Sequence, residues 1–309
     1  MIANLKKFLL CCLWERAFGL HHNLAIGKKF YNIQCWDKVF KPYAKVFHLH
    51  TPKVAGCSVV EDLSTLIGRK EVFSNELCFS SASRGLYKDT VVMVRRPRDH
   101  VLSQYEFCKA ATDLAYRFIV WKHQGLPGQK SYHLPSSFGK WIDEWRYTPR
   151  FGDQGIYEDY DQCYCPWNLQ TSRLQCDQPN YCYPNPDLDK ALENMNTATL
   201  LGVTEAYHES FCLFHAHLMG SLPDHCNCEH PAWASYKETD DTHGEIYNET
   251  IADMGKDVIE AVDYMTSKDV VLYRAGVKRF IAEIEQVEKR FGSKILCEGR
   301  RRMLDHLVK

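Results

Sequence analysis

The segment KVFHLHTPKVAGCSVVEDLSTL, residues 45–66, decides the fold of this chain. Residues 45–50 have the composition of a short β-strand, and the proline and glycine of residues 51–56 predict a turn. From about Cys57, apolar residues recur every three or four positions, which predicts a helix with one apolar face. The segment is therefore a strand, a turn and a helix in direct succession.

The segment TVVMVRRPRDHVLS, residues 90–103, repeats this order. Residues 90–94 form a β-branched run typical of a strand that is buried on both faces, and a polar turn leads from it into a helix. We expect further strands at 72–77 and 199–203, and helices at 138–145, 205–218 (capped by Thr204), 257–265 and 269–291. Strands that alternate with helices predict an α/β fold: a central parallel sheet flanked by helices.

The first turn has the composition of a phosphate cradle. Ala55 and Gly56 let the backbone approach a ligand, and the start of the helix offers free N–H groups and the positive end of a dipole. Lys53 adds a positive charge and Ser58 a hydroxyl. The G-x-x-x-x-G-K-[ST] pattern of nucleoside-triphosphate P-loops is absent. An ordinary turn with a solvated lysine is the alternative interpretation.

The second turn offers a second anion site. Arg95 stands at the strand end, where it could hold a phosphate bidentately, and Ser103 could add a hydroxyl bond two helical turns further on. A solvated, charged helix start is the alternative. Two such units in one sheet indicate a ligand with two separated phosphate groups. The nucleotide PAPS, with a 5′-phosphosulfate and a 3′-phosphate, fits this description.

The two turns resemble the 5′-phosphosulfate loop (H-I-P-K-T-G/A-G-T-S) and the 3′-phosphate loop (R-D-P-x-x-R-x-x-S) of PAPS-dependent sulfotransferases. The resemblance is strongest to the Golgi carbohydrate group that includes the heparan and chondroitin O-sulfotransferases. Three further segments follow in the order of that family: NLQTSRL at 168–174, GVTEAYHES at 202–210 and DVVLY at 269–273. Together the motifs span residues 45–285.

The resemblance implies a P-loop-like nucleotide-binding fold. It also implies transfer of a sulfuryl group from PAPS to an acceptor hydroxyl, with a carbohydrate as the expected acceptor and PAP as the product. The residues that it implies for donor binding are Lys53, Val54, Ala55, Gly56, Cys57, Ser58, Arg95 and Ser103, to which we add Arg173.

The chain departs from the family pattern at four positions. Val54 and Cys57 stand where threonine is common, so two hydroxyl contacts to the donor are missing. In the second loop Arg96 replaces the usual aspartate and His100 the usual arginine, which puts the fine geometry of that loop in doubt. Arg95 itself is intact.

Catalysis by the family requires two groups. One offsets the negative charge on the leaving oxygen, and the other is a base that removes a proton from the acceptor hydroxyl. The resemblance assigns the first role to Lys53. Glu76, 76 − 53 = 23 residues further on, is our candidate base, and we expect neighbouring cations to hold it ionised. A surface or capping glutamate is the alternative. Weaker candidates for the base are His123, His133 and Glu61, and for donor contacts Thr171, Ser235 and Lys237.

The composition limits the class of protein. The 309 residues carry a formal net charge of -1, which disfavours nucleic acid or an anionic membrane as partner.

Fourteen cysteines favour disulfides over a zinc site. Six of them form two groups, Cys163, Cys165, Cys176 and Cys182, then Cys226 and Cys228. With the sequon at Asn248, they favour the secretory pathway and the Golgi lumen. The short apolar run at residues 8–14 predicts no membrane span, and a cytoplasmic location stays open.

The pattern divides the chain into an N-terminal extension (1–40), a sulfotransferase-like domain (41–291) with a Cys/Tyr-rich loop near 146–187, and a basic C-terminal tail (292–309). Aromatic residues in and before this loop could stack on sugar rings, although packing is the commoner role: Trp121, Trp141, Trp145, Tyr157 and Trp167.

Two alternative functions stay open: a catalytically inactive glycan-binding protein of the same fold, and a nucleotide-dependent phosphotransferase. The oligomeric state is not predicted.

Overall fold

The computed structural model describes residues 41–76, 79, 86–111, 135–147, 164–175, 185–235 and 250–308. Several predicted features lie outside these residues: the N-terminal extension, most of the loop near 146–187, the Asn248 sequon, and Cys163, Cys176, Cys182, Trp121, His123, His133, Tyr157 and Lys237.

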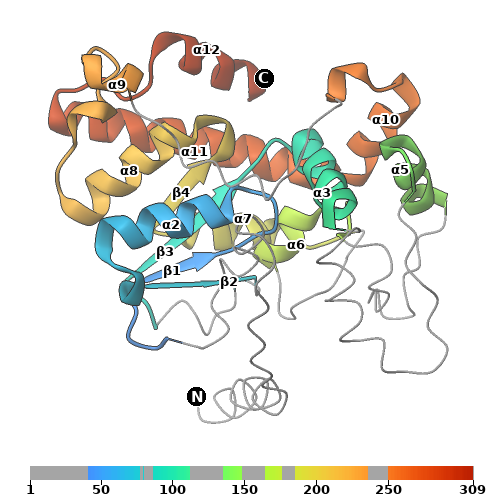
Figure 1. The fold of residues 1–309 in the computed structure, drawn as a ribbon, viewed down its shortest axis with the longest axis horizontal. Coiled ribbons are helices and arrows are strands. Elements are labelled where there is room, and N and C mark those ends of the chain that lie inside the picture. Colours follow the sequence, from blue (N-terminus) through green and yellow to red (C-terminus); the bar gives the residue numbers. More distant parts are fainter. Residues whose placement is uncertain are drawn as a thin grey trace, which may run out of the picture.

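The centre of the fold is a four-stranded parallel sheet (Figure 1). Its strands are β1 (Val46–Leu49), β2 (Val72–Asn75), β3 (Asp89–Val94) and β4 (Leu200–Val203), in the spatial order β2-β1-β3-β4. Almost every strand residue is buried, as expected for β-branched runs covered by helices on both faces. The prediction of an α/β fold with a central parallel sheet is confirmed.

The helices largely follow the predicted periodicity. They are α2 (Gly56–Ile67), α3 (Pro97–Ala111), α5 (Phe138–Tyr147), α6 (Leu169–Gln175), α7 (Leu188–Thr197), α8 (Tyr207–Met219), α9 (Pro231–Ser235), α10 (Lys256–Met265), α11 (Ser267–Phe291) and α12 (Glu298–Leu307). One predicted cap is wrong. Residues Thr204–Ala206 form a short 3-10 helix, so Thr204 lies inside that turn and α8 starts only at Tyr207.

The order of the strands creates a switch point. β1 pairs with β2 on one side and with β3 on the other: Phe47 lies opposite Phe73 and also opposite Thr90. The chain runs from β1 through α2 to β2, then crosses back past β1 to β3. Ligands of open α/β sheets bind outside the carboxyl ends of the strands at such a point. The turns after β1 and β3 both leave the sheet there.

Helices cover the two faces of the sheet differently. Gly202 in β4 faces α8, because a Cβ at this position would lie 2.8 Å from the Phe214 ring. Gly276 in α11 contacts the opposite face, where its neighbours include side chains of Val94 and Leu201. α2 packs beside α8, and α11 contacts α6 and α7 (Figure 1). The main core therefore lies in two layers, one on each face of the sheet.

A second apolar cluster joins α3, α5 and α10 beside the sheet. Trp141 and Trp145 of α5 are fully buried in it, and Trp167 is nearly so. These three aromatic side chains pack against other apolar groups, so the alternative that they stack on sugar rings is not supported for them. The cluster fixes α3, which follows the second predicted turn.

The predicted C-terminal tail contains an ordered helix. α12 packs on the main core through Leu304, which is fully buried. Within the part of the chain that the structure describes, no helix combines the length and the apolar character that crossing a membrane requires.

Candidate anion-binding site

The turn after β1 has the backbone shape of an anion-binding nest. Lys53 and Ala55 both adopt left-handed conformations, with φ of 63° and 66°. Such a conformation costs a residue other than glycine about 1–3 kcal/mol, and it turns successive N–H groups toward one side. Ala55 is also the N-cap of α2 and its side chain provides no cap, so the first N–H groups of the helix have no intrahelical acceptor. The turn and the helix start together offer donors for an anion.

Gly56 is required by an internal contact. A Cβ at this position would lie 2.1 Å from Cδ2 of the buried His50 ring, a distance that real side chains do not show. The sequence predicted that Gly56 gives a ligand access to the backbone. The structure adds a second reason for the glycine: the missing side chain makes room for His50, a residue that sequence reasoning did not single out.

The two predicted turns are in direct contact. Nη1 of Arg95 donates a hydrogen bond to the carbonyl oxygen of Lys53 at 2.8 Å. Nε2 of His100, on the first turns of α3, lies 2.8 Å from the carbonyl oxygen of Pro52. Burial lowers the pKa of His100 to about 3, so the ring is neutral near pH 7 and donates from Nε2. His100 therefore supplies no charge to a ligand. It joins the two turns.

Gln170 holds the backbone of Arg95 from both sides. Its Oε1 accepts from the Arg95 N–H, and its Nε2 donates to the Arg95 carbonyl oxygen, each at 2.9 Å. Gln170 lies at the start of α6, where the buried Asp269 carboxylate accepts hydrogen bonds from the N–H groups of Gln170 and Thr171. Burial raises the pKa of Asp269 to about 6, although these donors oppose the shift. Asp269 thus fixes the helix start that positions Gln170.

Glu205 supports the next residue of the same turn. Its Oε1 accepts from the N–H of Arg96 at 2.8 Å, and its Oε2 accepts from the hydroxyl of Tyr273 at 2.9 Å. The Arg96 side chain pairs with Asp99 at 2.5 Å. Glu205 and Tyr273 belong to two of the three downstream segments noted in the sequence, and Gln170 belongs to the third. All three segments therefore support the turn that carries Arg95.

The ammonium group of Lys53 lies over an aromatic ring. Its Nζ is 4.6 Å from the centroid of Phe107 on α3, a cation–π contact. The Phe107 ring in turn lies 5.6 Å, centroid to centroid, from Tyr164. No spacing rule in the sequence points to Phe107, because its contact with Lys53 depends on how α3 packs beside the first turn.

Glu76 follows β2 and lies near two cations, Lys53 and Arg173. Nη1 of Arg173 donates to the Glu76 carbonyl oxygen at 2.9 Å. Burial nevertheless raises the pKa of the Glu76 carboxyl, and the opposing effects of Arg173 and Lys53 do not reverse the shift. The two cations favour the ionised form, as the sequence led us to expect, but burial outweighs them in the direction of the shift. A carboxyl with a raised pKa can exchange a proton closer to neutral pH.

The structure brings most of the predicted donor residues to one edge of the sheet, but not all with exposed side chains. The Val54 side chain is fully buried in the main core, so only its backbone can face a ligand. Cys57 is disulfide-bonded. Ser58 and Ser103 are buried, Ser103 completely. Among the weaker candidates, Glu61 is exposed further along α2, Ser235 is exposed on α9, and Thr171 is bound to Asp269.

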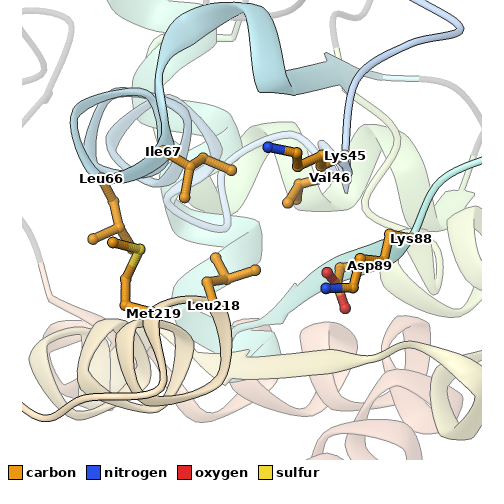
Figure 2. Close-up of a pocket in the computed structure, with 8 residues that line it drawn as sticks. All are labelled: Lys45, Val46, Leu66, Ile67, Lys88, Asp89, Leu218 and Met219. Atoms are coloured by element: carbon orange, nitrogen blue, oxygen red, sulfur yellow. The ribbon is translucent and has the colours of Figure 1, made fainter.

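A pocket of about 340 Å³ lies at the opposite edge of the sheet (Figure 2). It is lined by the starts of β1 and β3 and by the ends of α2 and α8. Two of its charged side chains already have partners: Asp89 binds His217 at 3.0 Å, and Lys45 pairs with Glu71 at 3.4 Å. The amino edge is also not where ligands of parallel α/β sheets bind. We therefore place the candidate site at the carboxyl edge.

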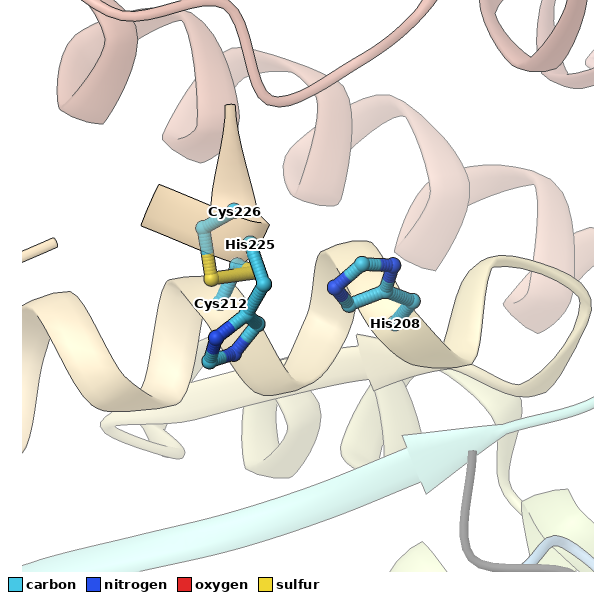
Figure 3. Close-up of side chains that lie close together, drawn as sticks. All are labelled: His208, Cys212, His225 and Cys226. Carbon is cyan, nitrogen blue, oxygen red and sulfur yellow. A yellow bond between two sulfur atoms is a disulfide. The ribbon is translucent and has the colours of Figure 1, made fainter. Parts of the chain in front are cut away.

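A cysteine–histidine group joins α8 to the segment that follows it (Figure 3). His208, Cys212, His225 and Cys226 each bring one potential metal ligand within 4.8 Å of the others. Cys212 and Cys226 form a disulfide, however, and only a thiolate binds a metal. In this state the two sulfur atoms are not available, and the disulfide interpretation of Cys226 is confirmed.

No protein-family model matches the chain, and neither the curated proteins nor the solved structures include a significant match. Its function is therefore inferred from the residues of the site.

Proposed function

We propose that this chain is a PAPS-dependent sulfotransferase of P-loop-like fold that transfers a sulfuryl group to a hydroxyl of a carbohydrate. One observation carries the proposal. The turns that follow β1 and β3 meet at the switch point of the sheet, where Arg95 binds the Lys53 carbonyl oxygen at 2.8 Å. Two anion-binding turns in contact suit one ligand that has an anionic group at each end.

The residues present fit a bis-anionic nucleotide. The left-handed backbone at Lys53 and Ala55 and the uncapped start of α2 form one subsite. The guanidinium of Arg95, whose backbone Gln170 fixes, forms the other. Because the first subsite uses backbone N–H groups, the loss of threonine hydroxyls at Val54 and Cys57 leaves its main donors in place.

The side chains around the first subsite suit group transfer. A bound donor supplies an activated sulfuryl group. Lys53 offsets the negative charge that develops on the departing phosphate oxygen, a role typically worth a factor of about 10²–10³ in rate. Glu76 takes the proton of the acceptor hydroxyl, and its raised pKa makes this transfer less unfavourable than for an ordinary carboxylate. Arg173 and Lys53 balance the charge of the ionised Glu76.

The disulfides support a secretory location for this activity. Besides Cys212 and Cys226, the structure contains disulfide-bonded Cys57, Cys108 and Cys165. Disulfides persist in oxidising compartments and are rare in the cytosol. We therefore propose the secretory pathway, with the Golgi lumen favoured, as the location of the enzyme.

The direct test is transfer itself. Purified protein is incubated with PAPS and a panel of glycan, alcohol and phenol acceptors, and sulfated products are measured by mass spectrometry. We expect transfer to at least one glycan, and loss of transfer in Lys53→Ala. Lys45→Ala is the matched control, because it removes a lysine at the opposite edge of the sheet, where its partner is Glu71. Transfer that survives in Lys53→Ala would refute the assignment of Lys53.

A further inference from the structure

Two free thiols lie against each other beside the Cys212–Cys226 disulfide. Cys228 and Cys297 are both half-buried and are separated by 297 − 228 = 69 residues. The N–H of Cys228 donates to the Lys294 carbonyl oxygen at 2.8 Å, and its Sγ lies 3.6 Å from the Ile295 carbonyl oxygen. The Cys297 side chain is close enough to the Cys228 thiol to raise its pKa. The backbone therefore already holds the two segments side by side.

We propose that Cys228 and Cys297 form a further disulfide. Cys226 and Cys228 then become the two anchors of a double crosslink. Cys226 is bonded to Cys212 on α8, and Cys228 is bonded to Cys297, the N-cap residue just before α12. Because Cys228 contacts the carbonyl oxygens of residues 294 and 295, two to three positions before Cys297, we expect small side-chain rotations to bring the two sulfur atoms to bonding distance.

The reaction needs an oxidant, and a small-molecule disulfide such as oxidised glutathione supplies it. A thiolate of the pair attacks the oxidant, which releases one reduced glutathione and leaves a mixed disulfide. The second cysteine loses its proton, attacks the protein sulfur of that mixed disulfide and releases the other glutathione. Burial, together with the adjacent Cys297 sulfur, raises the pKa of the Cys228 thiol to about 12. Cys228 is therefore a slow attacking thiol near neutral pH.

The crosslink has a consequence for the proposed site, and this part rests on the proposed function. Arg300, in the first turn of α12, donates from Nη1 to the Glu205 carbonyl oxygen at 2.6 Å and from Nε to Glu209 at 3.1 Å. Glu205 in turn binds the N–H of Arg96, next to Arg95. A crosslink at Cys297 thus fixes the start of α12, and Arg300 carries that restraint to the turn that would bind the 3′-phosphate.

The sequence allows a sharp test by peptide mapping. Trypsin, which cleaves after lysine and arginine, releases Cys297 in the hexapeptide 295–300, whereas Cys212, Cys226 and Cys228 remain together in the peptide 191–237. The purified full chain is alkylated without reduction, digested and analysed by mass spectrometry. We expect the two peptides to be joined and the hexapeptide to appear only after reduction. An alkylated hexapeptide from unreduced protein would overturn the proposal.

Variants separate this link from other pairings. Cys228→Ser should release the hexapeptide and leave the Cys212–Cys226 loop closed; a crosslink that persists in this variant would also overturn the proposal. The Cys228→Ser/Cys297→Ser double variant should melt roughly 5–10 °C below the wild type, since a disulfide typically contributes a few kcal/mol. Each single variant should lose as much as the double variant, because either change breaks the same bond.

Binding of PAP distinguishes the formation of the disulfide from its effect on the proposed nucleotide site. If the link positions Arg300, PAP should bind several-fold more weakly to the double variant than to the wild type. Equal affinities would overturn the positioning role. A wild type that carries the crosslink but does not bind PAP would refute the proposed function and leave the disulfide established.

Discussion

Replacement of Gln170 by leucine tests whether the second turn depends on its support. Gln170 makes two hydrogen bonds to the backbone of Arg95, both of 2.9 Å. Leucine has nearly the same volume but can neither accept from the Arg95 N–H nor donate to its carbonyl oxygen. The Gln170→Leu variant should therefore fold, but with the turn that carries Arg95 unsupported.

The expected cost follows from these two bonds. Each contributes about 1 kcal/mol net, and partly buried polar groups that lose a partner add to this, so we expect a loss of about 2–3 kcal/mol in the free energy of unfolding. For a chain of this size that corresponds to a melting temperature lower by roughly 5–10 °C. If Arg95 binds the 3′-phosphate, its displacement should also weaken PAP binding by about tenfold, which is about 1.4 kcal/mol.

Thermal unfolding and isothermal titration with PAP measure the two effects separately. Tyr105→Phe is the matched control. It removes one buried hydrogen bond, from the Tyr105 hydroxyl to the Pro135 carbonyl oxygen at 3.1 Å, in the helical cluster beside the sheet. It should cost about 1 kcal/mol of stability and leave PAP affinity unchanged. A Gln170→Leu protein that is destabilised but binds PAP as tightly as the wild type would refute the role given to this turn.

Three further results are expected. Because burial raises the pKa of Glu76, the rate of transfer should fall as the pH drops through a value above 4.5. The Glu76→Gln variant should be slower by a factor of about 10²–10⁴, and its rate should no longer fall at acid pH. Gly56→Ala should lower the free energy of unfolding by about 1–3 kcal/mol, measured in urea, since its Cβ would lie 2.1 Å from the His50 ring. Burial lowers the pKa of His48 and of His100 to about 3. The free energy of unfolding should therefore be highest above pH 6.5 and should decrease as the pH falls toward 3, because the unfolded chain then binds protons that the folded chain does not. At pH 5 this loss approaches about 2 kcal/mol for each histidine, and urea unfolding at pH 7.5 and pH 5 measures it.

The sequence predicted the elements around the site because their signals are local. Residues 45–66 and 90–103 each contain a strand, a turn and a helix start, and the structure has all of them. Adjacent parallel strands send their turns to the same edge of the sheet. The proximity of Lys53 and Arg95 therefore followed from two correct strand assignments and from their pairing in the sheet.

The contacts within the site could not be predicted in the same way. Gln170 lies 75 positions from Arg95 and Phe107 lies 54 from Lys53, so both contacts depend on the tertiary packing of α6 and α3. The pKa of Glu76 is a similar case. The sequence led us to expect cations near it but not its burial, and burial determines the direction of the shift.

Binding of PAP to variants of the two turns tests the central claim most directly. Titration calorimetry compares PAP, adenosine 5′-phosphate and ATP with magnesium on wild type, Lys53→Ala and Arg95→Ala. We predict that the wild type prefers PAP to adenosine 5′-phosphate by at least tenfold, and that Arg95→Ala loses this preference because the 3′-phosphate has lost its partner. Lys53→Ala should bind both nucleotides more weakly. Tight binding of ATP with magnesium but not of PAP, or an Arg95→Ala variant that still prefers PAP, would contradict the account.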